Sequence, residues 1–167
     1  MHFGAFYNKP KVIEYYLSSN KTIEKKNPGV ISSDKLKGRT PFHFACQEGH
    51  LKIVQMMLKV LKEKNPGDAY NFTALHIAAV QGQFEVVKAL SDVINVKNPH
   101  ASYYWRYETP LYMAAEKGHL KTVEFFINDS AAIANEKTQR GFFGETAYGG
   151  FQLLDLITTE LKSHITC

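Results

Sequence analysis

The side chains of this chain best suited to metal binding or proton transfer are histidines at matched positions. His43 and His76 lie 33 residues apart in similar surroundings, while His50 and His119 each follow a glycine. Imidazole binds metal ions and transfers protons near neutral pH. A zinc site needs further ligands at matched spacing, and the sequence offers none around these residues. We therefore interpret the histidines as structural and predict no metal site.

Nucleophilic catalysis is the second chemistry to consider, because Thr40, Thr73 and Thr109 recur at one position. An active site needs a nucleophile, a base and oxyanion donors brought together, but each Thr is already explained as a helix N-cap. The glycines between Gly141 and Gly150 follow no strand and open no clear phosphate-binding motif. We predict that the protein is not an enzyme, with no catalytic residue, no cofactor and no small-molecule substrate.

The two cysteines, Cys46 and Cys167, are too few for a disulfide framework. Cys46 stands where related segments carry Ala79 and Ala115, so a small buried thiol is the expected role. A free thiol in a core suits a reducing compartment. We expect a cytoplasmic protein, with the nucleus as the alternative location.

Bulk composition indicates one folded unit. The chain has 167 residues, of which 44% are apolar and 22% charged, which suffices for a sizeable core. No run approaches the roughly 18 apolar residues that span a bilayer, and residues 1–10 lack the pattern of a secretory signal. We therefore expect a soluble, unexported protein with no membrane insertion.

The elements that must position these side chains come from three similar segments. They are RTPFHFACQEGHLKIVQMML at 39–58, FTALHIAAVQGQFEVVKAL at 72–90 and ETPLYMAAEKGHLKTVEFFI at 108–127. The opening Thr recurs after 33 and then 36 residues, an interval typical of stacked helix-turn-helix arrays. An array of this kind offers an extended surface, which favours recognition over chemistry.

Each segment predicts two helices. Thr caps the first helix, and Pro41 and Pro110 fall at its first position, where a missing N–H costs nothing. A glycine with a left-handed backbone conformation is expected to end this helix in each segment, at Gly49, Gly82 and Gly118. The second helix carries an apolar stripe, which we assign to Leu51, Val54 and Leu58, to Phe84, Val87 and Leu90, and to Leu120, Val123 and Ile127. Since neither helix covers its own stripe, adjacent units must stack.

The TPFH, TALH and TPLY openings, the paired small residues and the QEGH, VQGQ and EKGH turns together resemble the ankyrin repeat. The resemblance covers about Asn27 to Ile127 and implies an all-α solenoid of antiparallel helix pairs, with hairpin-like loops at one edge. It also implies that His43 and His76 tie neighbouring repeats together by hydrogen bonds, with Tyr112 in that place in the third unit.

We assign a single domain over 1–167. It comprises a truncated N-terminal repeat or cap at 1–26, repeats at 27–64, 65–97 and 98–134, and a degenerate repeat or C-terminal cap at 135–167. Residues 4–17, GAFYNKPKVIEYYL, align without gaps onto ACQEGHLKIVQMML at 45–58, so the chain begins partway through a repeat.

The resemblance implies a non-enzymatic module that binds a partner protein through its concave face and loop tips. The exposed positions just before each turn are Gln47, Glu48, Val80, Gln81, Glu116 and Lys117. The loop tips offer Arg39, Asp68, Tyr70, Phe72 and Glu108. The identity of the partner does not follow from these residues.

An aromatic run in one connector adds a sharper candidate. It reads Tyr103, Tyr104, Trp105, Arg106 and Tyr107, and Tyr, Trp and Arg are residue types that often dominate interface energetics. A partner-binding loop is one interpretation, and the other is that these aromatics fold back onto the neighbouring repeat.

The alternative site is a basic connector at 21–39. It holds six basic and two acidic residues and so accounts for the whole net charge of +4. Such a stretch could bind nucleic acid or phosphoinositide. The run lacks aromatics for base stacking, so we favour a solvated loop and do not expect nucleic acid as the partner. A regulatory ankyrin domain excised from a larger channel or enzyme is the third hypothesis.

Overall fold

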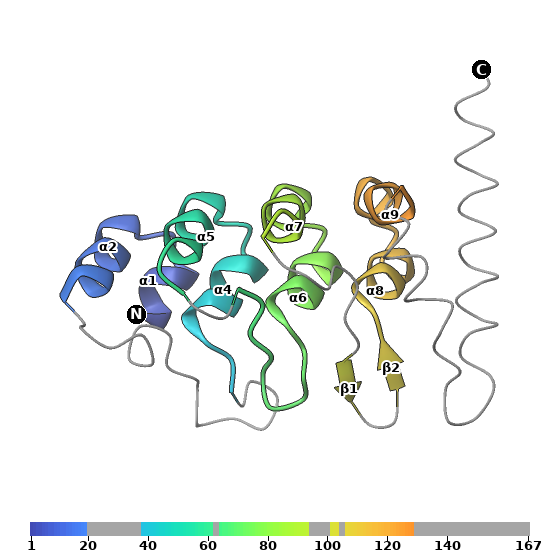
Figure 1. Ribbon diagram of the computed structural model, residues 1–167, viewed down its shortest axis with the longest axis horizontal. Coiled ribbons are helices and arrows are strands. Elements are labelled where there is room, and N and C mark those ends of the chain that lie inside the picture. The colour runs from blue at the N-terminus through green and yellow to red at the C-terminus, as the bar shows by residue number, and fades with distance from the viewer. Residues whose placement is uncertain (20–37, 62–63, 94–100, 104–105, 129–167) are drawn as a thin grey trace, which may run out of the picture.

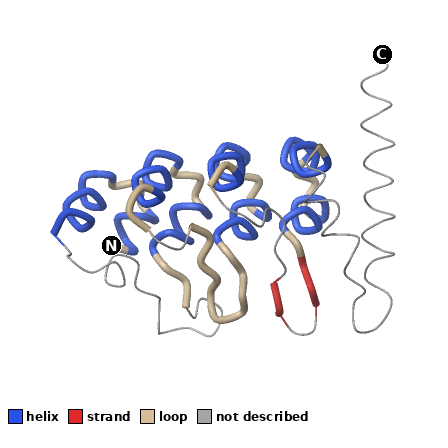
Figure 2. The backbone as a smooth tube through the Cα atoms, in the orientation of Figure 1, coloured by secondary structure: helices blue, strands red, loops and turns tan. Residues whose placement is uncertain are grey.

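Helices lie in antiparallel pairs that follow one another along the stack in chain order (Figure 1). The computed structural model describes residues 1–19, 38–61, 64–93, 101–103 and 106–128. Within these ranges the first helices form one row, the second helices form another, and the connecting loops project beyond the first row (Figure 2).

The helix pairs of the described residues have these bounds. They are α1 (His2–Phe6) with α2 (Pro10–Ser19), α4 (Pro41–Gln47) with α5 (Leu51–Leu58), α6 (Ala74–Val80) with α7 (Phe84–Ser91), and α8 (Pro110–Glu116) with α9 (Leu120–Ile127). Each first helix packs on the first helix of the next pair, and each second helix on the next second helix. The predicted all-α stack of helix pairs is confirmed.

Helices α4, α6 and α8 begin where the sequence predicted. Thr40, Thr73 and Thr109 are the N-caps of α4, α6 and α8, with extended backbone in all three cases. The Thr109 hydroxyl accepts a hydrogen bond from the backbone N–H of Tyr112 at 3.1 Å. Pro41 takes the first position of α4, where its missing N–H leaves no gap in the helical hydrogen bonding. The three entrances are therefore equivalent.

The turn between paired helices is the same in every unit. Gly49, Gly82 and Gly118 have φ angles of 71°, 68° and 72°, which fall in the left-handed region that favours glycine. In the first pair Asn8 takes this position with φ 51°, a conformation that Asn tolerates better than most residues. Residues 2–19 therefore form a helix pair like the later ones, as the alignment of residues 4–17 predicted.

The core lies between the two rows and continues from unit to unit. In the second helices it includes Ile13 of α2, Ile53, Val54, Met57 and Leu58 of α5, Val86, Val87 and Leu90 of α7, and Thr122, Val123 and Phe126 of α9. Our prediction for α9 was wrong at Leu120, which is 50% exposed. A second helix packs on its own partner helix and on second helices of adjacent units, so its third, fourth and seventh positions are enclosed while its first residue lies at the rim.

Within the described ranges, two of the connectors have hairpin-like structure. Strand β1 (Ala101–Tyr103) pairs antiparallel with β2 (Arg106–Glu108), placing Ser102 opposite Tyr107 and Tyr103 opposite Arg106. In the preceding connector Gly67 forms an isolated antiparallel bridge with Thr73. The loops that the resemblance implied are thus present at the edge of the stack.

Several predictions fall outside the described residues. They concern most of the basic connector at 21–39, the pair Tyr104 and Trp105, the degenerate repeat or cap at 135–167, and Cys167. Among the helices within the described ranges, none is long and apolar enough to cross a membrane.

Candidate protein-interaction surface

Three side chains at the turns connect each unit to the one before it. His50 Nε2 donates to the Phe6 carbonyl at 2.9 Å, Gln83 Nε2 to the Gln47 carbonyl at 3.0 Å, and His119 Nε2 to the Val80 carbonyl at 3.0 Å. We call these side chains the turn latches. Gln replaces His in the middle unit because its amide also presents an N–H at the end of a short side chain. His50, Gln83 and His119 therefore each connect one unit to the unit before it by a hydrogen bond.

The buried His43 joins its own helix cap to the next connector. Its Nδ1 accepts from the Thr40 backbone N–H at 3.0 Å, so Nε2 carries the proton and donates to the Pro66 carbonyl at 2.8 Å. Burial lowers the pKa of His43 to about 4, against an opposing effect of the Asp68 carboxylate, so the ring is neutral at pH 7. Both ring nitrogens are used in the fold.

His76 repeats part of this arrangement, since its Nδ1 accepts from the Thr73 backbone N–H at 3.2 Å. Among the described residues, no three His, Cys, Asp or Glu side chains are grouped so that they could hold a metal ion. Cys46 is fully buried and unpaired, and burial raises the pKa of its thiol, as expected for a small core residue.

Asp68 organises the loop between α5 and α6. Its Oδ1 accepts from the backbone N–H groups of Tyr70 at 2.9 Å and Phe72 at 3.0 Å, and its Oδ2 lies 3.4 Å from Arg39 Nε. The guanidinium also donates from Nη1 to Gln47 Oε1 at 3.1 Å. The Asp68 side chain is only 2% exposed and that of Arg39 is 21% exposed, so much of both groups is committed to the fold.

The other loop-tip residues lie in the loop between α5 and α6 and in the hairpin of β1 and β2. Tyr70 is half-buried, and the half-buried Phe72 packs edge-on against His76 with ring centroids 5.7 Å apart. For Tyr103, Arg106 and Glu108 the backbone forms the hairpin. In the loop between α5 and α6, the side chain of Tyr70 is therefore more accessible to a partner protein than that of Asp68.

The residues just before each turn occupy two neighbouring positions, which are the last residue and the C-cap of each first helix. Gln81, Glu116 and Lys117 are exposed, while Gln47, Glu48 and Val80 are half-buried. Gln47 Nε2 donates to Glu48 Oε1 at 2.8 Å, and Lys117 Nζ lies 3.9 Å from Glu116 Oε2. These side chains come from α4, α6 and α8, which lie next to one another, so the structure brings them onto one row.

Phe6 and Tyr7 extend this row and were missed by the sequence analysis. Both are exposed, and they stand at the positions of Gln47 and Glu48 in the first helix pair. The ungapped alignment of residues 4–17 already placed them there. We name the combined set the pre-turn surface, and it consists of Phe6, Tyr7, Gln47, Glu48, Val80, Gln81, Glu116 and Lys117.

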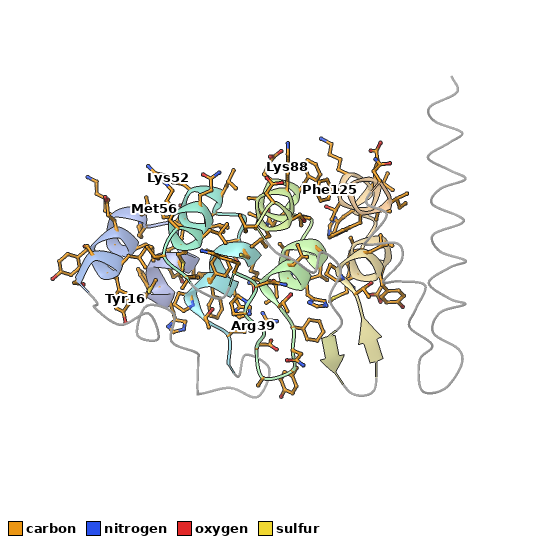
Figure 3. All side chains as sticks on the ribbon, in the orientation of Figure 1. Tyr16, Arg39, Lys52, Met56, Lys88 and Phe125 are labelled. Atoms are coloured by element: carbon orange, nitrogen blue, oxygen red, sulfur yellow. The ribbon has the colours of Figure 1, made fainter. Side chains whose placement is uncertain are left out.

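The second helices form the side of the stack opposite the loops. Lys52 on α5 and Lys88 on α7 point outward from the second-helix row, away from the first helices (Figure 3). Arg39, by contrast, lies among the loops at the other edge (Figure 3). The two sides can therefore be altered independently.

Comparison with known families agrees with this geometry. A family model described as ankyrin repeats, three copies, matches residues 1–99, and the single ankyrin repeat model matches residues 106–139. No curated protein matched the chain. The match over 1–99 does not divide the copies, so our boundaries between units stay predictions. Residues 1–99 are more than half of the chain, and we conclude that it belongs to the ankyrin repeat family.

Proposed function

We propose that this protein is a non-enzymatic interaction module that binds a partner protein across the pre-turn surface and the adjacent loop tips. Ankyrin repeats generally act as protein-binding modules. The observation that carries the proposal is the recurrence of solvent-accessible side chains at the last residue and the C-cap of the four first helices that the structure describes. Neighbouring helices pack about 8–10 Å apart, so the row extends over roughly 30 Å.

The chemistry of this row changes along the stack. Its first unit offers the aromatic pair Phe6 and Tyr7, its middle units offer two amides, one carboxylate and Val80, and its last unit offers Glu116 beside Lys117. An interface of ordinary size buries about 800 Å² per partner. A partner that places an apolar group over the aromatic end and polar groups over the rest would fit this surface.

The experiment is capture of partners from lysate by the immobilised chain of 167 residues. The test variant combines Gln81→Lys with Lys117→Glu, both at exposed positions, so its melting temperature should equal that of the wild type. The control combines Lys52→Glu with Lys88→Glu on the second-helix row. We expect the captured protein to fall at least about tenfold for the test variant only. Equal capture by both variants would refute the proposal.

Phosphate binding by the basic connector at 21–39 is the competing function. Arg39 is its last residue, and its side chain is already engaged with Asp68 and Gln47, which weighs against a free cationic site there. Titration with a labelled oligonucleotide and with phosphoinositide vesicles at low and moderate salt separates the two functions. Tight binding that falls steeply with salt would favour the connector.

A further inference from the structure

Four side chains form a hydrogen-bonded network that runs from the loop between α5 and α6 to the end of α4. Asp68 Oδ2 lies 3.4 Å from Arg39 Nε, and Arg39 Nη1 donates to Gln47 Oε1 at 3.1 Å. Gln47 Nε2 in turn donates to Glu48 Oε1 at 2.8 Å. One end of the network is the Asp68 side chain, which is 2% exposed, and the other end is Glu48, half-buried on the pre-turn surface.

The network leaves the Gln47 side chain a single orientation. Arg39 can only donate hydrogen bonds, so the amide oxygen of Gln47 faces it and the amide nitrogen faces Glu48. The backbone of Gln47 is held as well, because its carbonyl accepts from the turn latch Gln83. Arg39 is paired with Asp68 and reaches Glu48 only through this neutral amide. The fold therefore positions the Glu48 carboxylate without neutralising it.

Glu48 differs in this respect from the other charged side chains of the pre-turn surface. Lys117 Nζ lies 3.9 Å from Glu116 Oε2, so those two charges offset each other. Tyr7 and Gln81 take the C-cap position of Glu48 in the two adjacent units, and both are uncharged. Within the described ranges, no ion pair joins a cation to Glu48, so its charge is the one on this surface that remains to be matched.

A partner that covers the pre-turn surface must remove water from Glu48. A carboxylate that loses its water without gaining a cation is strongly unfavourable, so the site rejects an apolar or acidic group. We propose that Glu48 selects partners that place a basic side chain, arginine or lysine, against its carboxylate. The inference rests on the proposed function, because it names the partner chemistry of the same surface.

The geometry of Glu48 favours such a contact. Its Oε1 is occupied by the Gln47 amide, while its Oε2 accepts no hydrogen bond from the described part of the chain. A guanidinium or ammonium group can donate a charge-assisted hydrogen bond to this second oxygen. Because the network already holds the carboxylate, less side-chain freedom is lost when the partner binds.

The expected preference is opposite to the one that follows from the charge of the whole chain. The net charge is +4, so long-range attraction alone would favour acidic partners. Salt screens this attraction more strongly than it screens a pair of charges in contact at a partly buried position. At moderate salt, the charge of the partner residue opposite Glu48 therefore distinguishes the two effects.

Selection from a random peptide library on the immobilised 167-residue chain, at about 150 mM salt, tests the proposal. Peptides of about 12 residues are long enough, when extended, to cover the row. We expect the selected peptides to share a basic residue at one position. For such a peptide, Glu48→Gln should raise the dissociation constant at least about tenfold, because it removes the charge but keeps an acceptor for the Gln47 amide.

Glu85→Gln is the matched control. Glu85 is also exposed but lies on α7 in the second-helix row, so its neutralisation should leave the dissociation constant unchanged. Both variants should keep the melting temperature of the wild type. Replacing the basic residue of the peptide by alanine should weaken binding to the wild type at least about tenfold. It should have little effect on binding to Glu48→Gln, since both changes remove the same contact.

The outcomes separate this inference from the proposed function. Selected peptides that lack a basic residue, or that bind Glu48→Gln as tightly as the wild type, would overturn the inference. The proposed function would stand in that case if Gln81→Lys with Lys117→Glu still weakened binding. Peptides that bind this double variant and the wild type equally, or a library that yields no binder, would overturn both.

Discussion

Gly82→Ala offers the most direct test of how the units are joined. Gly82 has φ 68°, and a Cβ atom there would lie 2.6 Å from both Cε1 and Nδ1 of His119. His119 is the turn latch that donates to the Val80 carbonyl. An alanine at this position must therefore accept a left-handed backbone and also displace the imidazole ring.

Gly118 separates these two costs. Its φ is 72°, almost the same as that of Gly82, but no described residue lies within 4 Å of the place that its Cβ would take. Gly118→Ala should cost only the conformational term, about 1–2 kcal/mol. Gly82→Ala should cost about 1 kcal/mol more, because the latch hydrogen bond is worth roughly 0.5–1.5 kcal/mol and its ring loses packing as well.

Urea unfolding of the two variants measures the difference. A cycle with His119→Ala isolates its cause, because without the ring the alanine at position 82 should cost no more than the one at position 118. We expect a coupling free energy of about 1 kcal/mol between positions 82 and 119. Equal costs for Gly82→Ala and Gly118→Ala, or a coupling near zero, would refute the latch as a source of stability.

Three further predictions concern the buried polar groups. Burial lowers the pKa of His43 to about 4 in the folded protein, against 6.5 in the unfolded chain. As the pH falls, the unfolded state therefore takes up a proton at His43 before the folded state does. The free energy of unfolding should therefore fall by about 3 kcal/mol as the pH drops from 6.5 to 4. Urea titrations at several pH values check this, and His43→Gln, which keeps an acceptor for the cap, should lose less. Cys46 should resist a thiol reagent in a Cys167→Ser background until urea unfolds the chain, and rapid labelling of the folded protein would contradict its burial. Asp68→Asn retains an acceptor for two loop N–H groups, whereas Asp68→Ala leaves both unsatisfied at about 1–3 kcal/mol each. Equal melting temperatures of these last two variants would show that the loop does not depend on the carboxylate.

The sequence predicted the features of this fold that depend on neighbouring residues. Thr40 and Pro41 specify a helix entrance, and Gly49 specifies its exit, because caps and left-handed turns are local preferences. The buried positions of α9 were harder to assign, since LKTVEFFI contains more than one apolar spacing. Phe126 fills the core and Leu120 does not, and only the packing of adjacent helices decides between them.

The candidate site was predictable in position but not in detail. Repetition placed Gln81 and Lys117 on one row without any structural information. Asp68 was expected at a loop tip, yet its carboxylate turns inward to Arg39, which lies 29 positions earlier in the chain. The pairing of His50 with Phe6 spans 44 positions. Contacts over such intervals arise from stacking and leave no signal in the local pattern.

The turn latches also explain why the pre-turn positions can vary without loss of the fold. The latch acceptors are Phe6, Gln47 and Val80, an aromatic, an amide and an aliphatic residue at one position of the repeat. Each accepts through its backbone carbonyl, so the hydrogen bond makes no demand on the side chain. The same bond fixes the distance between successive units and therefore the spacing of the side chains that project from them. The donors at the turns thus join the units, and under the proposed function the side chains that the latch does not constrain are available for recognition.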